Sequence, residues 1–140
     1  MGTGAIKVCE RFEQSAEDVW AAITQVDAMR SWLFAELIAF EARGGFKTEF
    51  NVHLDGKDFL HQWEVLEVIP RRKLVYSWRY KGYPGDSSVT WLLDERKSAT
   101  ELQFTHEGHE SITGDDLFSY NNSLAGWRYL IGQSLKDYLS

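Results

Sequence analysis

The feature that most constrains the fold is a regular spacing of apolar residues in the last part of the chain. Between Asp115 and Leu139 they recur at steps of three and four, at Leu117, Tyr120, Leu124, Trp127, Ile131, Leu135 and Tyr138. This spacing places a single apolar stripe along an α-helix. We therefore predict one long helix over Asp115–Leu139, with its stripe buried against the rest of the chain.

Most of the preceding sequence has the pattern of short β-strands separated by turns. Turn signals such as Asp55-Gly56 and Gly82 to Gly85 stand between apolar-rich runs, which is typical of an antiparallel meander. Ser15 is a suitable N-cap for a helix that reaches Val26, and a short helical turn follows at Ala28–Trp32. The predicted strands are Ala5–Phe12, Glu36–Ala42, Phe46–Val52, Phe59–Ile69, Leu74–Tyr80, Ser88–Leu93 and Glu101–His106.

Alternation along these strands separates an aromatic side of the sheet from a polar side, because successive residues of a strand face opposite ways. The aromatic side contains Phe59, His61, Trp63, Val65, Leu74, Tyr76, Trp78, Tyr80, Val89, Trp91, Leu93, Leu102, Phe104 and His106. We expect the long helix to pack on this side. The prediction is an α+β fold in which a curved antiparallel sheet wraps around a C-terminal helix, with residues 1–140 forming a single domain.

Charge and cysteine content exclude several classes of partner. The formal net charge of −6 opposes binding to phosphate backbones and to anionic lipid surfaces, so we expect neither a nucleic acid nor a membrane partner. A single cysteine, Cys9, excludes an internal disulfide and fits a reducing compartment, where a buried thiol behaves as a small hydrophobe. With no apolar signal sequence or membrane span in the sequence, we predict a cytoplasmic protein.

A set of motifs, in a fixed order, resembles a known family. The motifs are Trp32, Gly44-Gly45, the stretch from Val65 to Pro70 followed by Leu74 to Trp78, the segment from Thr100 to Gly108, and Gly126-Trp127 in the last helix. They resemble the START-like, or SRPBCC, superfamily and, within it, the domain named after homologues of the activator of the Hsp90 ATPase (AHSA-type). The resemblance covers nearly the whole chain.

The resemblance implies a helix-grip fold, also called START-like or Bet v-like. It consists of a strand, two small helices, a six-stranded meander and a long helix, with a cavity between sheet and helix. Superfamily members bind lipids, hormones or polyketides, a minority are cyclases or hydrolases, and others are named as co-chaperones. Our main hypothesis is a module that binds a small apolar or aromatic ligand in the cavity. The alternatives are an enzyme that uses the same cavity and a chaperone ATPase co-regulator, which rests on the family name alone. A homodimer is also left open.

Ten side chains from the aromatic side, the helices and the helix stripe are candidates for ligand binding. They are Trp32, His61, Trp63, Tyr76, Trp78, Trp91, Phe104, Tyr120, Leu124 and Trp127. Aromatic faces bury apolar ligands, and the polar edges of Tyr and Trp orient them. The alternative for each residue is an ordinary place in the hydrophobic core.

The histidines on the aromatic side are candidates for polar contacts with a ligand. His61 and His106 could form a hydrogen bond with a ligand carbonyl or act as general bases, and the alternative for both is a satisfied interior histidine. His106 and His109 have a spacing that loosely suggests a metal ligand pair, but the loop contains Gly108, and we expect a solvated surface there.

No catalytic residue, cofactor or metal site is predicted. The sequence has no Gly-x-Ser-x-Gly nucleophile elbow and no glycine-rich phosphate loop. Cys9 lies in a strand without an identifiable partner base.

Overall fold

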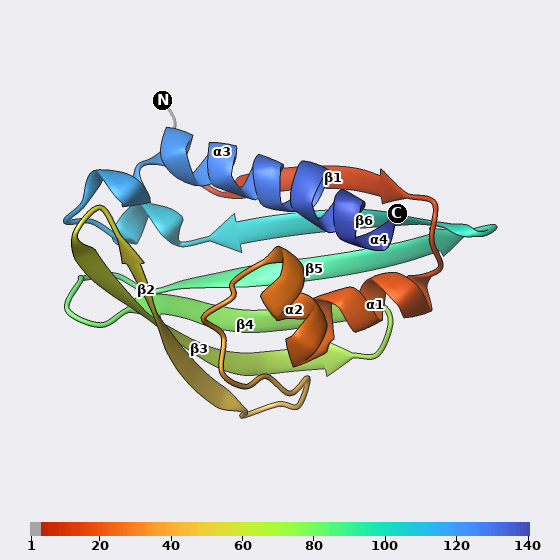
Figure 1. Cartoon of the computed structure of the whole chain (residues 1–140), viewed down its shortest axis with the longest axis horizontal. Helices are drawn as coiled ribbons and strands as arrows, with labels where there is room; N and C mark the ends of the chain where they lie inside the picture. Colours follow the sequence, from red (N-terminus) through yellow and green to blue (C-terminus); the bar gives the residue numbers. More distant parts are fainter. Residues whose placement is uncertain (1–3) are drawn as a thin grey trace.

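A computed structural model describes residues 4–140, and these form one six-stranded antiparallel sheet packed on helices (Figure 1). The strands are β1 (Ile6–Phe12), β2 (Lys47–Leu54), β3 (Lys57–Ile69), β4 (Lys73–Tyr80), β5 (Ser87–Arg96) and β6 (Ala99–Glu107). Their order is β1-β6-β5-β4-β3-β2, so β2 to β6 form a meander and β1 pairs with the last strand, with Ile6 opposite His106. The predicted α+β helix-grip class is confirmed.

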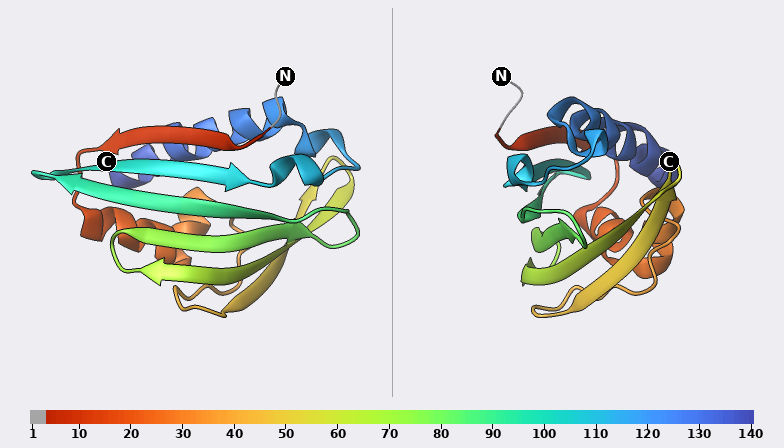
Figure 2. Two further views of the ribbon diagram at one scale, coloured as in Figure 1. Left: turned by 180° about the vertical axis from the view of Figure 1, so that it is seen from behind. Right: turned by 90° about the vertical axis from the view of Figure 1, so that its left-hand side faces the viewer.

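All of the longer helices lie on one face of the sheet, which curves around them (Figure 2). They are α1 (Ala16–Thr24), α2 (Val26–Trp32) and a continuous C-terminal helix made of α3 (Tyr120–Tyr129), the π-helical segment η3 (Leu130–Leu135) and α4 (Lys136–Leu139). Two short 3-10 turns, η1 (His109–Ser111) and η2 (Asp116–Phe118), connect β6 to α3. None of the helices within residues 4–140 is long and apolar enough to span a bilayer.

The aromatic side of the sheet is the buried side, as the alternation predicts. In β4 the residues Leu74, Tyr76 and Trp78 are at most 2% exposed. Neighbouring rings meet mainly edge to face, and the centroids of Trp78 and Trp127 lie 5.3 Å apart. This geometry is favoured by the ring quadrupoles, so the aromatic side both fills the core and fixes the helix on the sheet.

The C-terminal helix starts later than predicted and contains a π-helical insertion. Ser119 caps α3 by accepting a hydrogen bond from the backbone N–H of Asn122, so the helix begins at Tyr120 and not at Asp115. A π-helical turn contains more residues than an α-helical turn, and the buried positions therefore continue in steps of four. As a result Leu139 packs against the core at the end of the helix, whereas Tyr138 is 44% exposed and leaves the predicted stripe.

The predicted strand Glu36–Ala42 is wrong, because this segment forms no strand. The buried residues are Leu37 and Phe40, three positions apart, while Ile38 is 74% exposed. That spacing does not match the two-residue period of a strand. The segment instead covers one end of the inner face, where the Phe40 ring packs against Tyr76 at a centroid distance of 5.6 Å.

The expected burial of Cys9 is also wrong. In β1 the inward residues are Ile6 and Val8, and Cys9, which follows Val8, faces outward. Cys9 pairs with Gln103 on the exposed side of β6. Its thiol is therefore free and exposed.

Candidate functional site

A cavity of about 180 Å³ lies between one end of the sheet and the first turns of the C-terminal helix. Its aromatic lining consists of Phe34, Phe59, Trp78, Tyr80, Phe118 and Trp127. Its aliphatic lining consists of Val52, Leu54, Leu117 and Leu130. The polar side chains are His61, His106, His109, Asn122 and Ser123, and no Asp, Glu, Lys or Arg of the described chain takes part.

Three of the ten predicted ligand-binding residues line this cavity, namely His61, Trp78 and Trp127. The others lie in the core or against it: Trp32, Trp63, Tyr76, Trp91 and Phe104 are buried, and Tyr120 and Leu124 pack partly buried against them. The strand register explains the division. His61 pairs with Tyr80 at one end of the inner face, whereas Trp91 pairs with Leu74 and Phe104 further along it. Only the first end borders the cavity.

Several lining residues were not predicted. Tyr80 lies on the predicted aromatic side and was identifiable by its parity. Phe34 and Phe118 come from connecting segments, and Ser123 comes from α3. The alternation of residues along strands cannot predict lining residues in these places. Phe34 follows Leu33, the C-cap of α2, and its ring lies 5.1 Å from that of His61.

His61 presents an unprotonated nitrogen to the cavity. Its Nδ1 lies 2.9 Å from the carbonyl oxygen of Phe59, and because a carbonyl only accepts, Nδ1 donates its hydrogen there. Burial lowers the pKa of His61 to about 4, against a smaller opposing effect of the Phe59 hydrogen bond. The ring is thus neutral at pH 7, with a lone pair on Nε2. The Nε2 atom has no hydrogen-bond partner among the described residues, and it is accessible from the cavity.

Ser87 fixes the tautomer of His106. The Ser87 hydroxyl donates to the carbonyl oxygen of Trp78 at 2.6 Å, so it accepts from Nε2 of His106 at 2.8 Å. Burial lowers the pKa of His106 to about 3, and the nearby His109 ring adds to this effect. Its Nδ1 is enclosed without a partner. His106 is therefore a fixed, neutral part of the cavity wall.

His109 is buried, contrary to the expectation of a solvated loop. It is 5% exposed, and its Nε2 lies 2.7 Å from the hydroxyl of Ser123 in α3. Burial lowers its pKa, against an opposing effect of Glu110. Within residues 4–140 no three His, Cys, Asp or Glu side chains are grouped to hold a metal ion. The contact with Ser123 instead ties η1 to the start of the C-terminal helix.

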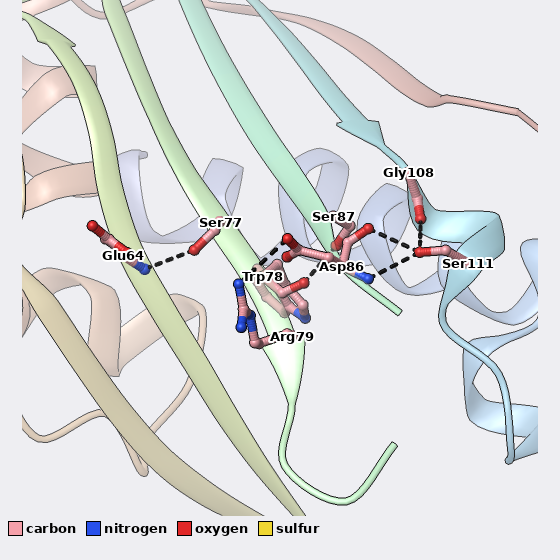
Figure 3. Close-up of polar contacts among 8 residues, drawn as sticks. All are labelled: Glu64, Ser77, Trp78, Arg79, Asp86, Ser87, Gly108 and Ser111. Atoms are coloured by element: carbon pink, nitrogen blue, oxygen red, sulfur yellow. Dashed lines mark hydrogen bonds and ion pairs between the residues drawn. The ribbon is translucent and has the colours of Figure 1, made fainter. Parts of the chain in front are cut away.

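The loops at this end are locked together by Ser111 (Figure 3). Its hydroxyl accepts from the backbone N–H of Asp86 at 3.0 Å and shares its hydrogen between the carbonyls of Asp86 and Gly108. Gly85 has a positive φ, and a Cβ there would lie 2.2 Å from the carbonyl oxygen of Ser111. The β4–β5 turn is therefore tied to η1, whose His109 lines the cavity.

A wider hollow of about 470 Å³ lies on the opposite, polar face of the sheet. Its lining includes Glu64, Ser77 and Arg79, which Figure 3 shows beside one another on β3 and β4. Two of these side chains are already engaged: Ser77 accepts from the Glu64 backbone N–H, and Arg79 pairs with Asp86 at 3.3 Å. This surface is open to water and charged, so we place the candidate site in the smaller inner cavity, where apolar surface is removed from water.

Comparison with known proteins agrees with this architecture. Residues 13–140 match the family described as "Activator of Hsp90 ATPase homolog 1-like protein". The chain belongs to this family. No curated protein matches it in sequence.

Several solved structures share the fold of this chain, and they belong to proteins with different names. Protein CV1439 from Chromobacterium violaceum has a TM-score of 0.79 at 23% identity, over 97% of this chain and 96% of that one. DynU16, a protein in the dynemicin biosynthetic locus, has a TM-score of 0.77 at 26% identity, over 98% of this chain and 47% of that one. The Aha1 dimer from Colwellia psychrerythraea has a TM-score of 0.74 at 18% identity, over 98% and 96%. These likenesses support the fold.

One glycine of the C-terminal helix, Gly126, borders the cavity of this family member. Gly126 lies inside α3, and a Cβ there would meet no atom within 4 Å. We expect Gly126→Ala to stabilise the protein by about 1 kcal/mol, because alanine favours the helix by that amount. Urea unfolding at equilibrium measures the change.

Gly132→Ala is the matched control. A Cβ at Gly132 would lie 3.2 Å from the carboxylate of Glu10, which pairs with Lys136, so part of the helix gain is offset. We expect a smaller stabilisation than for Gly126→Ala. A loss of stability in Gly126→Ala would contradict the open space at that position.

Proposed function

We propose that this protein binds a small, neutral, mainly aromatic molecule in the cavity between the sheet and the C-terminal helix. The observation that carries the proposal is a partly open, ring-lined space beside the helix whose described lining has no carboxylate, ammonium or guanidinium group. Apolar cavities in proteins hold apolar guests because the guest leaves water without losing hydrogen bonds.

The volume sets the size of the ligand. Drug-sized sites usually measure about 300–1,000 Å³, whereas an apolar cavity of about 150 Å³ is known to bind benzene. The cavity described above measures about 180 Å³. It therefore suits a single aromatic ring with one or two substituent atoms, and is too small for a lipid or a polycyclic molecule unless side chains move.

Binding is better supported than catalysis or co-chaperone action. The titratable groups in the lining are three histidines and Tyr80; burial lowers the histidine pKa values and raises that of Tyr80 to about 12. All four are thus neutral at pH 7 and poorly matched to acid–base catalysis near that pH. The co-chaperone role is supported by the family description alone. A homodimer is supported by the dimer among the similar structures.

Filling the cavity should abolish binding. Leu130 is part of the lining, and Leu130→Trp places an indole in or across the space. We expect the wild type to bind toluene with a dissociation constant on the order of 1 mM or tighter, and the variant to show no saturable binding. Titration followed by amide NMR shifts of the lining residues measures both.

Tyr129→Trp is the control for this experiment. Tyr129 precedes Leu130 but is 62% exposed and borders no part of the cavity, so this variant should bind toluene like the wild type. The proposal is wrong if toluene fails to saturate the wild type, or if Leu130→Trp binds it equally well.

A further inference from the structure

Two neighbouring residues of the cavity lining each have one polar atom with unused hydrogen-bonding capacity, and the two capacities are of opposite kind. His61 and Tyr80 pair across β3 and β4, and their ring centroids lie 4.6 Å apart. The Nε2 lone pair of His61 has no donor among the described residues. The Tyr80 hydroxyl accepts from Nε1 of Trp78 at 2.8 Å, but its own hydrogen has no acceptor there.

The surroundings of His61 and Tyr80 determine which ligand group the pair prefers. Phe59, Phe118 and Phe34 stand around it, so the surface beside the pair is otherwise apolar. A single group that donates one hydrogen bond and accepts another satisfies both atoms at once. A hydroxyl does this, whereas a carboxylate only accepts and carries a charge that nothing in the lining compensates.

We infer that the ligand is a neutral one-ring aromatic alcohol of the phenol type, whose hydroxyl donates to His61 Nε2 and accepts from the Tyr80 hydroxyl. This inference rests on the proposed function and narrows it. Trp78 holds Tyr80 in place through its indole N–H, and the Phe59 carbonyl holds His61 with its lone pair free. Both polar atoms are therefore oriented before a ligand arrives, which limits the entropy lost on binding.

The test compares phenol with toluene on the wild type, His61→Phe and Tyr80→Phe. The two probes have nearly the same size, and toluene forms no hydrogen bond. We expect each substitution to weaken phenol binding about fivefold, the value of one hydrogen bond of ordinary strength, and to change toluene binding less than twofold. Benzoate should not bind the wild type. Retained toluene binding demonstrates that a variant keeps its cavity.

A measurement on the wild type alone covers the case in which a variant does not fold. The nitrogen-15 resonance of His61 Nε2 should shift on addition of phenol and stay unchanged with toluene. The inference is overturned if phenol leaves this resonance unchanged, or if folded variants lose phenol and toluene affinity equally. A wild type that binds neither probe contradicts the proposed function itself, whereas one that binds toluene and shows no preference for the hydroxyl contradicts only the inference.

Discussion

Trp78→Ala is expected to cost about 3–5 kcal/mol of unfolding free energy and at the same time to enlarge the cavity. Trp78 is 2% exposed, and its ring lies within 6 Å of Trp63, Trp127, His61 and His106. Removing the indole takes away one ring contact from each of these neighbours and adds the vacated volume to the cavity. The variant should bind naphthalene, which we expect the wild type to exclude. Urea unfolding measures the stability, and fluorescence of the bound naphthalene measures the second effect.

Trp91→Ala is the control that separates the loss of stability from the enlargement of the cavity. Trp91 is 1% exposed and donates to the hydroxyl of Tyr76 as Trp78 donates to that of Tyr80, but it does not border the cavity. We expect a similar loss of stability and no gain in naphthalene binding. If Trp91→Ala acquires the same affinity for naphthalene, the cavity is not confined to one end of the sheet.

The unfolding free energy should fall steeply as the pH is lowered from 7 to 5. His61 and His106 have folded-state pKa values of about 4 and about 3, both below the ordinary 6.5 of an unfolded histidine. Below pH 6.5 the unfolded chain takes up protons that the folded chain does not, so stability is fully present above that pH and is lost towards pH 4 and pH 3. At pH 5 each histidine accounts for a loss of about 2 kcal/mol. Urea unfolding at a series of pH values measures this.

Single substitutions show how much each histidine contributes to the pH dependence of stability. His61→Phe should remove about 2 kcal/mol of the loss between pH 7 and pH 5, because its ring no longer titrates in the unfolded chain. His109, whose pKa burial also lowers, adds a further loss of the same sign. A stability that is flat between pH 7 and pH 5 would mean that both rings are hydrated in the folded protein.

The sheet and its buried face were predictable from the sequence because they depend on alternation and turns. Trp63, Tyr76 and Trp91 follow the period of two within strands that end at recognisable turns, and all are buried. The segment around Leu37 and Phe40 was misjudged because its apolar content resembles a strand, while its contacts with Tyr76 are set by the tertiary fold.

The site was less predictable because the cavity occupies only one end of the buried face. Parity distinguishes the inner side from the outer side, but it does not tell which inner residues lie beside a void. His109 depended on a partner in another element, Ser123, fourteen positions away. The start of the helix at Tyr120 was decided by the cap at Ser119, a local signal that the longer apolar spacing from Leu117 onward concealed.

The pairing of β1 with β6 has a consequence for synthesis of the chain. Ile6 meets His106, roughly 100 residues later, and at ribosomal rates of about 5–20 residues per second β1 waits several seconds before its partner exists. The hairpins from β2 to β5 involve only near neighbours and can pair during this interval. β1 is thus the last of the six strands to join the sheet, and a nascent chain that stalls before β6 leaves Ile6 and Val8 uncovered for chaperones or aggregation.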